Sequence, residues 1–198
     1  MTEQTVISAV EWFALASGVA YIILEILQRK AMWIVGIATG AACAVSFGIQ
    51  HVYAQMLLNI YYVGVSVWGI RQWAAASEKL EEETGGSVAI HIGTPGRTVK
   101  AFSVLAFVAG TALMSFLLKL SGGHLYVLDA ATAVLSAIAT FWLARSYVAQ
   151  WLMWVAADLM STVLCLLGGM PWMALLYAGY AISAVYGWYH WKKHGIRV

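Results

Sequence analysis

The stretch Trp151-Leu-Met-Trp-Val-Ala-Ala-Asp158-Leu-Met-Ser-Thr162 is apolar except for one carboxylate, Asp158, near its middle. A carboxylate at the centre of a bilayer costs about 2.5 to 3.5 kcal/mol, so a membrane helix usually keeps one for an ion, a proton or a cationic substrate. Helical spacing puts Trp151, Trp154 and Asp158 on one face. Two indole rings beside a negative charge suit a flat organic cation. The alternative is a structural Asp158, hydrogen-bonded to a Ser or Thr of a neighbouring helix.

Apolar residues dominate the rest of the chain as well. Of its 198 residues, 62% are hydrophobic and 10% are charged. A soluble domain could not bury that much apolar surface, so we expect an integral membrane protein. Cys43 and Cys165 both fall inside apolar segments, which indicates small core residues rather than a disulfide or a metal site.

Seven segments reach the roughly 18 to 21 residues that a membrane helix needs, which predicts an all-α integral membrane protein. Most connections between them are short, so neighbouring helices are expected to be antiparallel. The exception is 74–100, a polar segment with Gly85-Gly86 and Pro95-Gly96, which we expect to be a cytoplasmic linker. The seven predicted transmembrane segments are 10–27, 31–49, 53–73, 101–118, 126–143, 147–167 and 171–191.

The two halves of the chain resemble each other. The third segment ends in Trp68-Gly69-Ile-Arg-Gln-Trp73 and the seventh in Tyr186-Gly187-Trp-Tyr-His-Trp191. Met32-Trp33 opens the second segment as Met153-Trp154 opens the sixth, which makes Trp33 the expected repeat mate of Trp154. Weak internal similarity of this kind is typical of transporters built from repeats.

An odd number of helices in each half predicts a parallel arrangement of the repeats. Residues 1–73 would form the first three-helix repeat, and 101–118 a connecting helix. The segment 119–198 would form the second repeat with a basic cytoplasmic tail. The expected topology is therefore 3+1+3, with the substrate site between the halves.

Lys and Arg residues predict the orientation of the chain. With the N-terminus outside and the C-terminus inside, Lys119 is the single basic residue of the eleven that faces outward. This asymmetry follows the positive-inside rule, so the basic tail indicates orientation and no nucleic-acid partner. His190 and His194 have the i, i+4 spacing of metal ligands, but no third ligand joins them, and we expect no metal site.

Polar residues inside the spans are candidates for the site. Gln55, Asn59 and Tyr62 follow one stripe of the third segment, and Tyr177 and Tyr180 lie one turn apart on the seventh. Amides in hydrocarbon must find partners, and tyrosine rings can stack on an aromatic ligand. Helix packing is the alternative for each of them. Four charged residues near helix ends are expected to be interfacial: Glu11, Glu25, Asp129 and Arg145.

These residues together resemble the Pnu family of bacterial vitamin-precursor transporters, which have a 3+1+3 fold related to the SWEET sugar transporters. The resemblance rests on Asn59-Ile-Tyr61-Tyr62, on Tyr147-Val-Ala-Gln150-Trp151-Leu-Met-Trp154 and on Leu176-Tyr177-Ala-Gly-Tyr180. The pattern is most similar to the thiamine branch, PnuT. The nicotinamide riboside branch, PnuC, typically has Gln at the position of Asn59 and Asn at the position of Asp158.

The resemblance implies a transporter of the bacterial inner membrane, without enzymatic activity or a cofactor. It would take up thiamine by facilitated diffusion with alternating access, and phosphorylation inside the cell would trap the vitamin. A nicotinamide riboside transporter is the main alternative; a riboflavin carrier and a proton-coupled carrier are weaker ones. A homo-oligomer in the lipid bilayer remains open. The expected substrate-binding residues are Asp158 for the cation, Trp154, Tyr62, Tyr177 and Tyr180 for ring stacking, Gln55 and Asn59 for polar edges, and Trp33 for the opposite wall.

Overall fold

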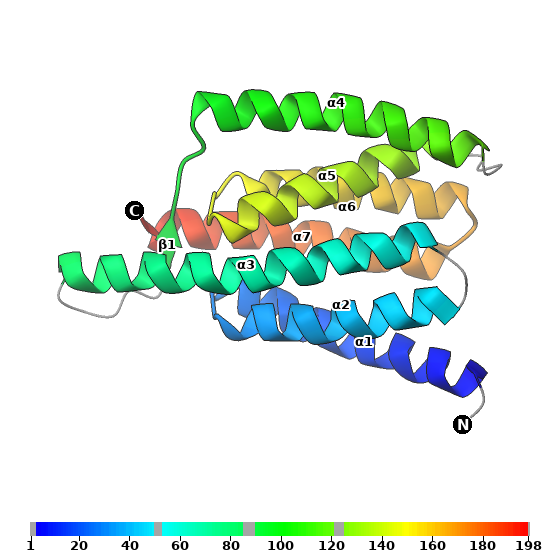
Figure 1. Ribbon diagram of the computed structural model, residues 1–198, viewed down its shortest axis with the longest axis horizontal. Helices are drawn as coiled ribbons and strands as arrows, with labels where there is room; N and C mark the ends of the chain where they lie inside the picture. Colours follow the sequence, from blue (N-terminus) through cyan, green and yellow to red (C-terminus); the bar gives the residue numbers. More distant parts are fainter. Residues whose placement is uncertain (1–2, 50–52, 85–89, 121–124, 198) are drawn as a thin grey trace. The chain divides into compact units, whose positions relative to one another are not determined.

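The computed structural model describes residues 3–49, 53–84, 90–120 and 125–197, and this part of the chain is almost entirely helical (Figure 1). Inside the helices, the side chains of 3–12, 14–15, 53–55, 80, 83–84 and 172 lie outside the described residues. The elements are α1 (Glu3–Ile26), α2 (Ala31–Ile49), α3 (Tyr53–Thr84), β1 (His91–Ile92), α4 (Arg97–Leu120), α5 (Tyr126–Ala144), α6 (Gln150–Leu167), α7 (Pro171–His194) and β2 (Ile196–Arg197).

The helices of the described chain correspond to the seven predicted segments, so the all-helical class is confirmed. Length and composition alone make α2, α4, α5 and α6 long and apolar enough to cross a membrane. In α7, tyrosines, tryptophans and a basic end dilute the apolar residues. The number of spans beyond these four, the 3+1+3 arrangement and the orientation stay predictions.

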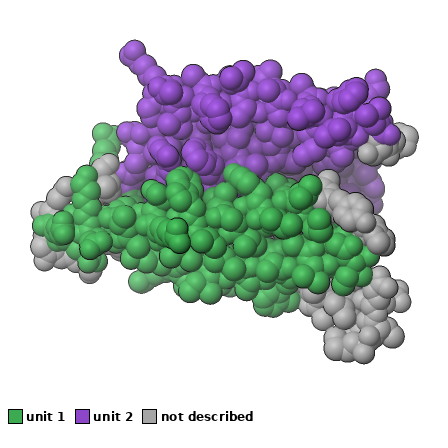
Figure 2. All heavy atoms as spheres, viewed as in Figure 1, with its two compact units in different colours: residues 1–91, 194–198 green, residues 92–193 purple. Residues whose placement is uncertain are grey.

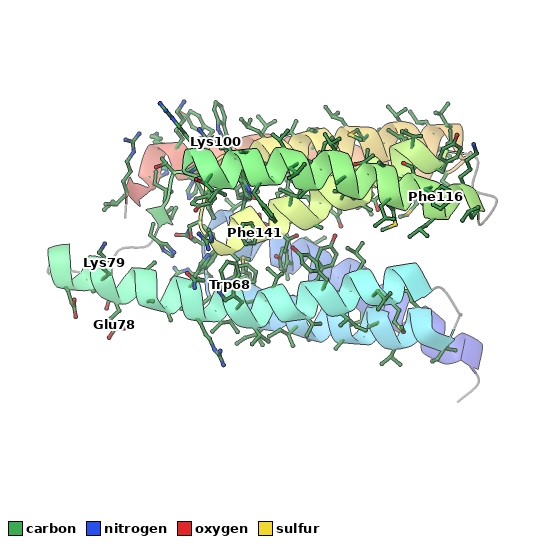
Figure 3. All side chains as sticks on the ribbon, turned by 45° about the horizontal axis from the view of Figure 1, so that its top comes forward. Trp68, Glu78, Lys79, Lys100, Phe116 and Phe141 are labelled. Carbon is green, nitrogen blue, oxygen red and sulfur yellow. The ribbon has the colours of Figure 1, made fainter. Side chains whose placement is uncertain are left out.

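Helix α3 is longer than the sequence pattern predicted, because it continues past Trp73 to Thr84. Three alanines and a run of Glu and Lys follow Trp73, and these residue types favour a helix wherever packing does not decide. Figure 3 shows Glu78 and Lys79 on this extension, and both are exposed. Much of the expected linker is thus a polar continuation of α3.

The chain divides into two compact units, drawn in different colours in Figure 2. Unit 1 consists of residues 1–91 and 194–198, and unit 2 consists of residues 92–193. Within unit 1, α2 packs against both α1 and α3. Within unit 2, α5 packs against both α4 and α6. Unit 1 therefore contains α1 to α3, and unit 2 contains α4 to α7.

Each unit contains the same tryptophan–glycine lock. In unit 1 the ring of Trp33 meets Trp73 edge-on, with 5.1 Å between the ring centroids. In unit 2 Trp151 meets Trp191 edge-on at 5.4 Å. A Cβ atom added at Gly69 would lie 2.6 Å from the ring of Trp33, and the equivalent atom at Gly187 would lie 2.6 Å from the ring of Trp151. Glycine is required at both positions because the indole occupies the space of a side chain.

These locks correct the expected register of the repeats. Trp33 and Trp151 are 118 residues apart, and the same separation holds for their glycine and tryptophan partners. It also relates Gln28 and Ser146, non-glycine residues with positive φ angles of 48° and 54°. The repeat mate of Trp33 is therefore Trp151, and the pairing with Trp154 was wrong. Matching the Met-Trp dipeptides of the two halves had shifted the expected register by three residues.

A clamp holds the chain where it leaves the polar extension of α3. The side-chain amide of Gln28 donates to the carbonyl oxygen of His91 at 2.8 Å and accepts from the backbone N–H of His91 at 2.6 Å. The His91 ring meets Trp73 edge-on at 5.6 Å. Burial and the positive charge of Lys30 lower the pKa of His91 from 6.5 to about 4. The backbone N–H of Ile196 donates a further hydrogen bond, at 3.0 Å, to the carbonyl oxygen of Ile90, the residue before His91.

Candidate functional site

Asp158 lies at the middle of α6 and is 8% exposed. The hydroxyl of Thr162 donates to the backbone carbonyl oxygen of Asp158, at 2.8 Å, and thus satisfies itself within the helix. Among the described residues no ion pair or side-chain hydrogen bond reaches the carboxylate. The structural alternative, a Ser or Thr of a neighbouring helix bonded to this carboxylate, is therefore not seen in the described part. A buried carboxylate without a described partner is costly, and an incoming cation would offset that cost.

Two tyrosines of α7 lie beside this carboxylate. The rings of Tyr177 and Tyr180 meet edge-on, with 6.1 Å between centroids, and both side chains are half-buried. Both phenols are close enough to Asp158 to interact with it electrostatically. The three-residue spacing puts the two rings on one face of α7. The structure therefore brings Asp158, Tyr177 and Tyr180 together, as the sequence pattern predicted.

The two tryptophans of α6 have different surroundings. Trp151 is 2% exposed and is held in the lock with Gly187 and Trp191, so packing accounts for its ring. Trp154 is half-buried, three residues further toward Asp158. The indole Nε1–H groups of both tryptophans are buried without a hydrogen-bond partner in the described part of the chain. Of the two indoles expected beside Asp158, Trp154 is the one that packing does not already account for.

The remaining candidates belong to unit 1. Asn59 and Tyr62 are half-buried on α3, and the Tyr62 ring lies 5.8 Å from that of Tyr61, tilted by 56°. The side chain of Gln55 lies outside the described residues. Trp33 is completely buried in its own lock, where helix packing accounts for it. Substrate contact by these four residues stays a prediction.

The corrected register reveals an asymmetry that sequence reasoning missed. The repeat position of Asp158 in unit 1 is Gly40, which lies 118 residues earlier. A Cβ at Gly40 would lie 2.9 Å from Cγ2 of Val63, so α2 and α3 leave no space there for an acidic side chain. The interior carboxylate thus belongs to the second repeat alone at this position. Aligning the locks would have found this signal in the sequence.

Two acidic residues expected at the membrane interface are less exposed to solvent than predicted. Glu25 is 4% exposed, and it interacts electrostatically with the half-buried Tyr21. Asp129 is half-buried and interacts electrostatically with Tyr177, whose phenol also interacts with Asp158. Nearness to a helix end suggested exposure, whereas Glu25 is buried and Asp129 is half-buried. Arg145 is exposed, as expected, and Glu11 lies outside the described side chains.

Comparisons with known proteins agree on one family. The family described as "Nicotinamide mononucleotide transporter" matches residues 8–193. The nicotinamide riboside transporter PnuC of Haemophilus influenzae is 26% identical over 193 residues, covering 92% of this chain and 80% of that protein. PnuC of Escherichia coli K12 is 24% identical, covering 93% of this chain and 85% of its own. The crystal structure of the vitamin B3 transporter PnuC has the same fold, with a TM-score of 0.68 at 23% identity over 94% of this chain and 81% of that one.

These comparisons confirm the Pnu family and contradict the expected substrate. Thiamine uptake, and with it the thiamine branch, was the wrong prediction, because the relatives are nicotinamide riboside transporters. The physical reason is that thiamine and nicotinamide riboside are both flat cations. A buried carboxylate among aromatic rings suits either of them, so Asp158 could not separate the two branches.

The family and the apolar helices also establish where the protein acts. Four helices can cross a membrane by length and composition, and the matched family consists of transporters. The protein is a multi-pass protein of the bacterial inner membrane. The match spans nearly the whole chain rather than one segment of it. The chain therefore belongs to the nicotinamide mononucleotide transporter family.

Proposed function

We propose that this protein carries nicotinamide riboside across the bacterial inner membrane, with Asp158 receiving the positive charge of the pyridinium ring. The relatives of known substrate support the choice of ligand. The observation that carries the role of Asp158 is its carboxylate, 8% exposed and without an ion pair among the described residues. In a site of low dielectric constant, such a charge attracts a cation far more strongly than it would in water.

The riboside suits this carboxylate better than the mononucleotide does. A phosphate group adds about −1.5 to −2 charges at neutral pH, which a buried carboxylate repels. A phosphate site would need Arg, Lys or free backbone N–H groups nearby. The basic residues of α5 to α7 that the structure describes lie at helix ends: Arg145 follows α5, and Lys192 and Lys193 close α7. We therefore expect the nucleoside to be preferred.

Aromatic side chains of unit 2 would hold the ring of the substrate. Trp154 lies one turn before Asp158 on α6, Tyr177 and Tyr180 lie on α7, and the faces of these rings can stack on a pyridinium. The Nε1–H of Trp154, which has no partner in the described structure, can donate to a carboxamide or a ribose hydroxyl. The contributions of Gln55, Asn59 and Tyr62 stay predictions, and Trp33 takes no part in this proposal.

We further infer a 3+1+3 topology with the N-terminus outside and the C-terminus inside. The repeated locks and the repeated positive-φ residues support equivalence of α1–α3 with α5–α7, because all recur after 118 residues. The distribution of Lys and Arg supports the orientation. The end of unit 2 at which α5 and α7 begin would then face outward.

Binding to the purified protein tests the proposal. Isothermal titration with nicotinamide riboside, its mononucleotide, thiamine and riboflavin should give the tightest binding for the riboside. Asp158→Asn keeps the size of the side chain and removes its charge, so affinity for the riboside should fall by about tenfold or more. Glu82→Gln is the matched control, because Glu82 is exposed on the polar extension of α3.

Two results would contradict different parts of the proposal. Tighter binding of another vitamin would overturn the substrate. Unchanged riboside affinity in Asp158→Asn would overturn the role of the carboxylate while leaving the substrate intact. Thermal unfolding of the same samples separates a local loss of binding from misfolding, since removing an unpaired buried charge should leave the protein at least as stable.

A further inference from the structure

Unit 2 contains a second interior carboxylate, Asp129 of α5, that the proposed site does not yet use. It is half-buried, and the phenol of Tyr177 interacts electrostatically both with it and with Asp158. Within the described chain, Asp129 has no ion pair and no side-chain hydrogen bond. Each carboxylate is at least partly withdrawn from water without a described partner, and a cation beside it would offset the cost of that burial.

The helical rise orders these three groups along unit 2. From the turn between α5 and α6, eight residues of α6 put Asp158 at a height of about 12 Å, and fifteen residues of α5 put Asp129 at about 22 Å. Helix α7 begins beside the far end of α6 and runs back, which puts Tyr177 at about 17 Å. The electrostatic link of Tyr177 to both carboxylates agrees with this order. Along the helix axes the order is therefore Asp158, Tyr177 and Asp129, with a height difference of about 10 Å between the two carboxylates.

Two ordinary roles for Asp129 must be weighed against a role in binding. An acidic residue in the first turn of a helix stabilises the positive end of the helix dipole, and Asp129 lies in the first turn of α5. A neighbouring lysine could also neutralise it. The nearby Lys119, however, lies over the ring of Tyr126, with Nζ 5.9 Å from the centroid. The dipole role predicts a loss of stability on substitution, and no dependence on the charge of a ligand.

We propose that Asp129 is a second cation-binding carboxylate, which receives the positively charged substrate before it reaches Asp158. The inference rests on the proposed function, and it adds a residue nearer the end of unit 2 where α5 and α7 begin. In the proposed topology that end faces outward, so Asp129 meets the cation first during uptake. Tyr177, which lies between the two carboxylates in height, offers the ring along which the pyridinium passes from one to the other.

A pair of ligands that differ in charge tests this role. Nicotinamide riboside carries a positive ring, whereas its dihydro form has nearly the same shape and no charge. In Asp129→Asn, the Kd for the cation should rise about tenfold, as expected for one charge lost at this range in a protein interior. The Kd for the dihydro form should stay within about twofold, because its binding does not depend on the charge. Asp129→Glu should restore cation binding, and Glu82→Gln again serves as the control.

The outcomes separate this inference from the proposed function. If the wild-type protein binds nicotinamide riboside and Asp129→Asn binds it equally well, Asp129 has no such role, although the proposed function stands. If Asp129→Asn weakens both ligands equally, the residue stabilises the helix end and the inference is wrong. If the wild-type protein binds neither ligand, the proposed function fails first and the inference falls with it.

Discussion

Gly69 and Gly187 are the positions at which a single methyl group should matter most. A Cβ at either would approach a buried indole to 2.6 Å, and neither Trp33 nor Trp151 has space to withdraw. We expect Gly187→Ala to lower the free energy of unfolding by about 1 to 3 kcal/mol, the usual cost of overpacking. Gly69→Ala should behave in the same way, because the two locks are equivalent. Thermal unfolding in detergent measures both changes.

Controls for this prediction lie on the same two helices. At Gly64 on α3 and Gly179 on α7, an added Cβ would have no atom within 4 Å of it. Alanine favours a helix over glycine by about 1 kcal/mol, so Gly64→Ala and Gly179→Ala should be neutral or stabilising. A lock variant that proved as stable as its control would show that the indole can move aside.

Single residues also mark the limit of what the sequence could predict. Asp158 stood out because a charge in an apolar helix needs an explanation, and the structure buries it beside the expected tyrosines. Trp33 was assigned a repeat mate from a two-residue match, although the mate is determined by the glycine and tryptophan it packs against. Such contacts join residues about one helix apart in the chain, and periodicity within one helix carries no information about them.

The side chain of Gln28 holds the connection between α1 and α2 in place. Gln28 makes two hydrogen bonds to the backbone of His91, and both residues are buried. Gln28→Asn should destabilise the protein by about 2 kcal/mol or more, because the shorter amide leaves a buried N–H and C=O unpaired. Asn tolerates the positive φ of this position, so the loss reports the hydrogen bonds rather than backbone strain.

The exposed Gln72 on α3 offers the matched control for this clamp. Gln72→Asn changes the same functional group on the surface and should alter the free energy of unfolding by less than about 0.5 kcal/mol. Equal stability of the two variants, measured by chemical denaturation, would argue that water replaces the Gln28 amide.

The same clamp should make stability depend on pH. The pKa of His91 is lowered from 6.5 to about 4, so between these values the unfolded chain binds a proton that the folded chain does not. The free energy of unfolding should therefore fall as pH falls from 6.5 to 4, by on the order of 3 kcal/mol from this group. His91→Phe keeps a ring against Trp73 and should remove this part of the pH dependence. His194→Gln, at an exposed site, should retain it.

Element boundaries followed the sequence only where hydrophobicity decides them. The turn after α5 and the start of α7 agree with the predicted segments, because charged or turn-forming residues interrupt an apolar run there. The end of α3 does not, because alanine, glutamate and lysine extend a helix without being apolar. Helix α4, by contrast, is apolar at its surface. Phe116, labelled in Figure 3, is exposed on this helix, as expected of a side chain that faces lipid.

Two units whose locks recur after 118 residues are the largest regularity of the molecule. The sequence revealed that a repeat exists, because the Gly-x-x-x-Trp endings of the third and seventh segments are alike. It did not reveal the substrate, since composition and spacing describe a cation site and two flat cations fit that description. The repeats also differ where function would require it, with Gly40 in one unit and Asp158 in the other.

The proposed orientation is testable on the whole molecule by cysteine labelling. Replacing Cys43 and Cys165 by alanine gives a background without thiols, into which Lys119→Cys or Glu82→Cys is introduced at an exposed position. If the N-terminus is outside, a membrane-impermeant maleimide applied to spheroplasts should label the cysteine at position 119 and spare the one at 82. Both should react after the membrane is opened. The reverse pattern would invert the topology, and because the basic residues of the turns would then face outward, it would also break the positive-inside rule on which the orientation depends.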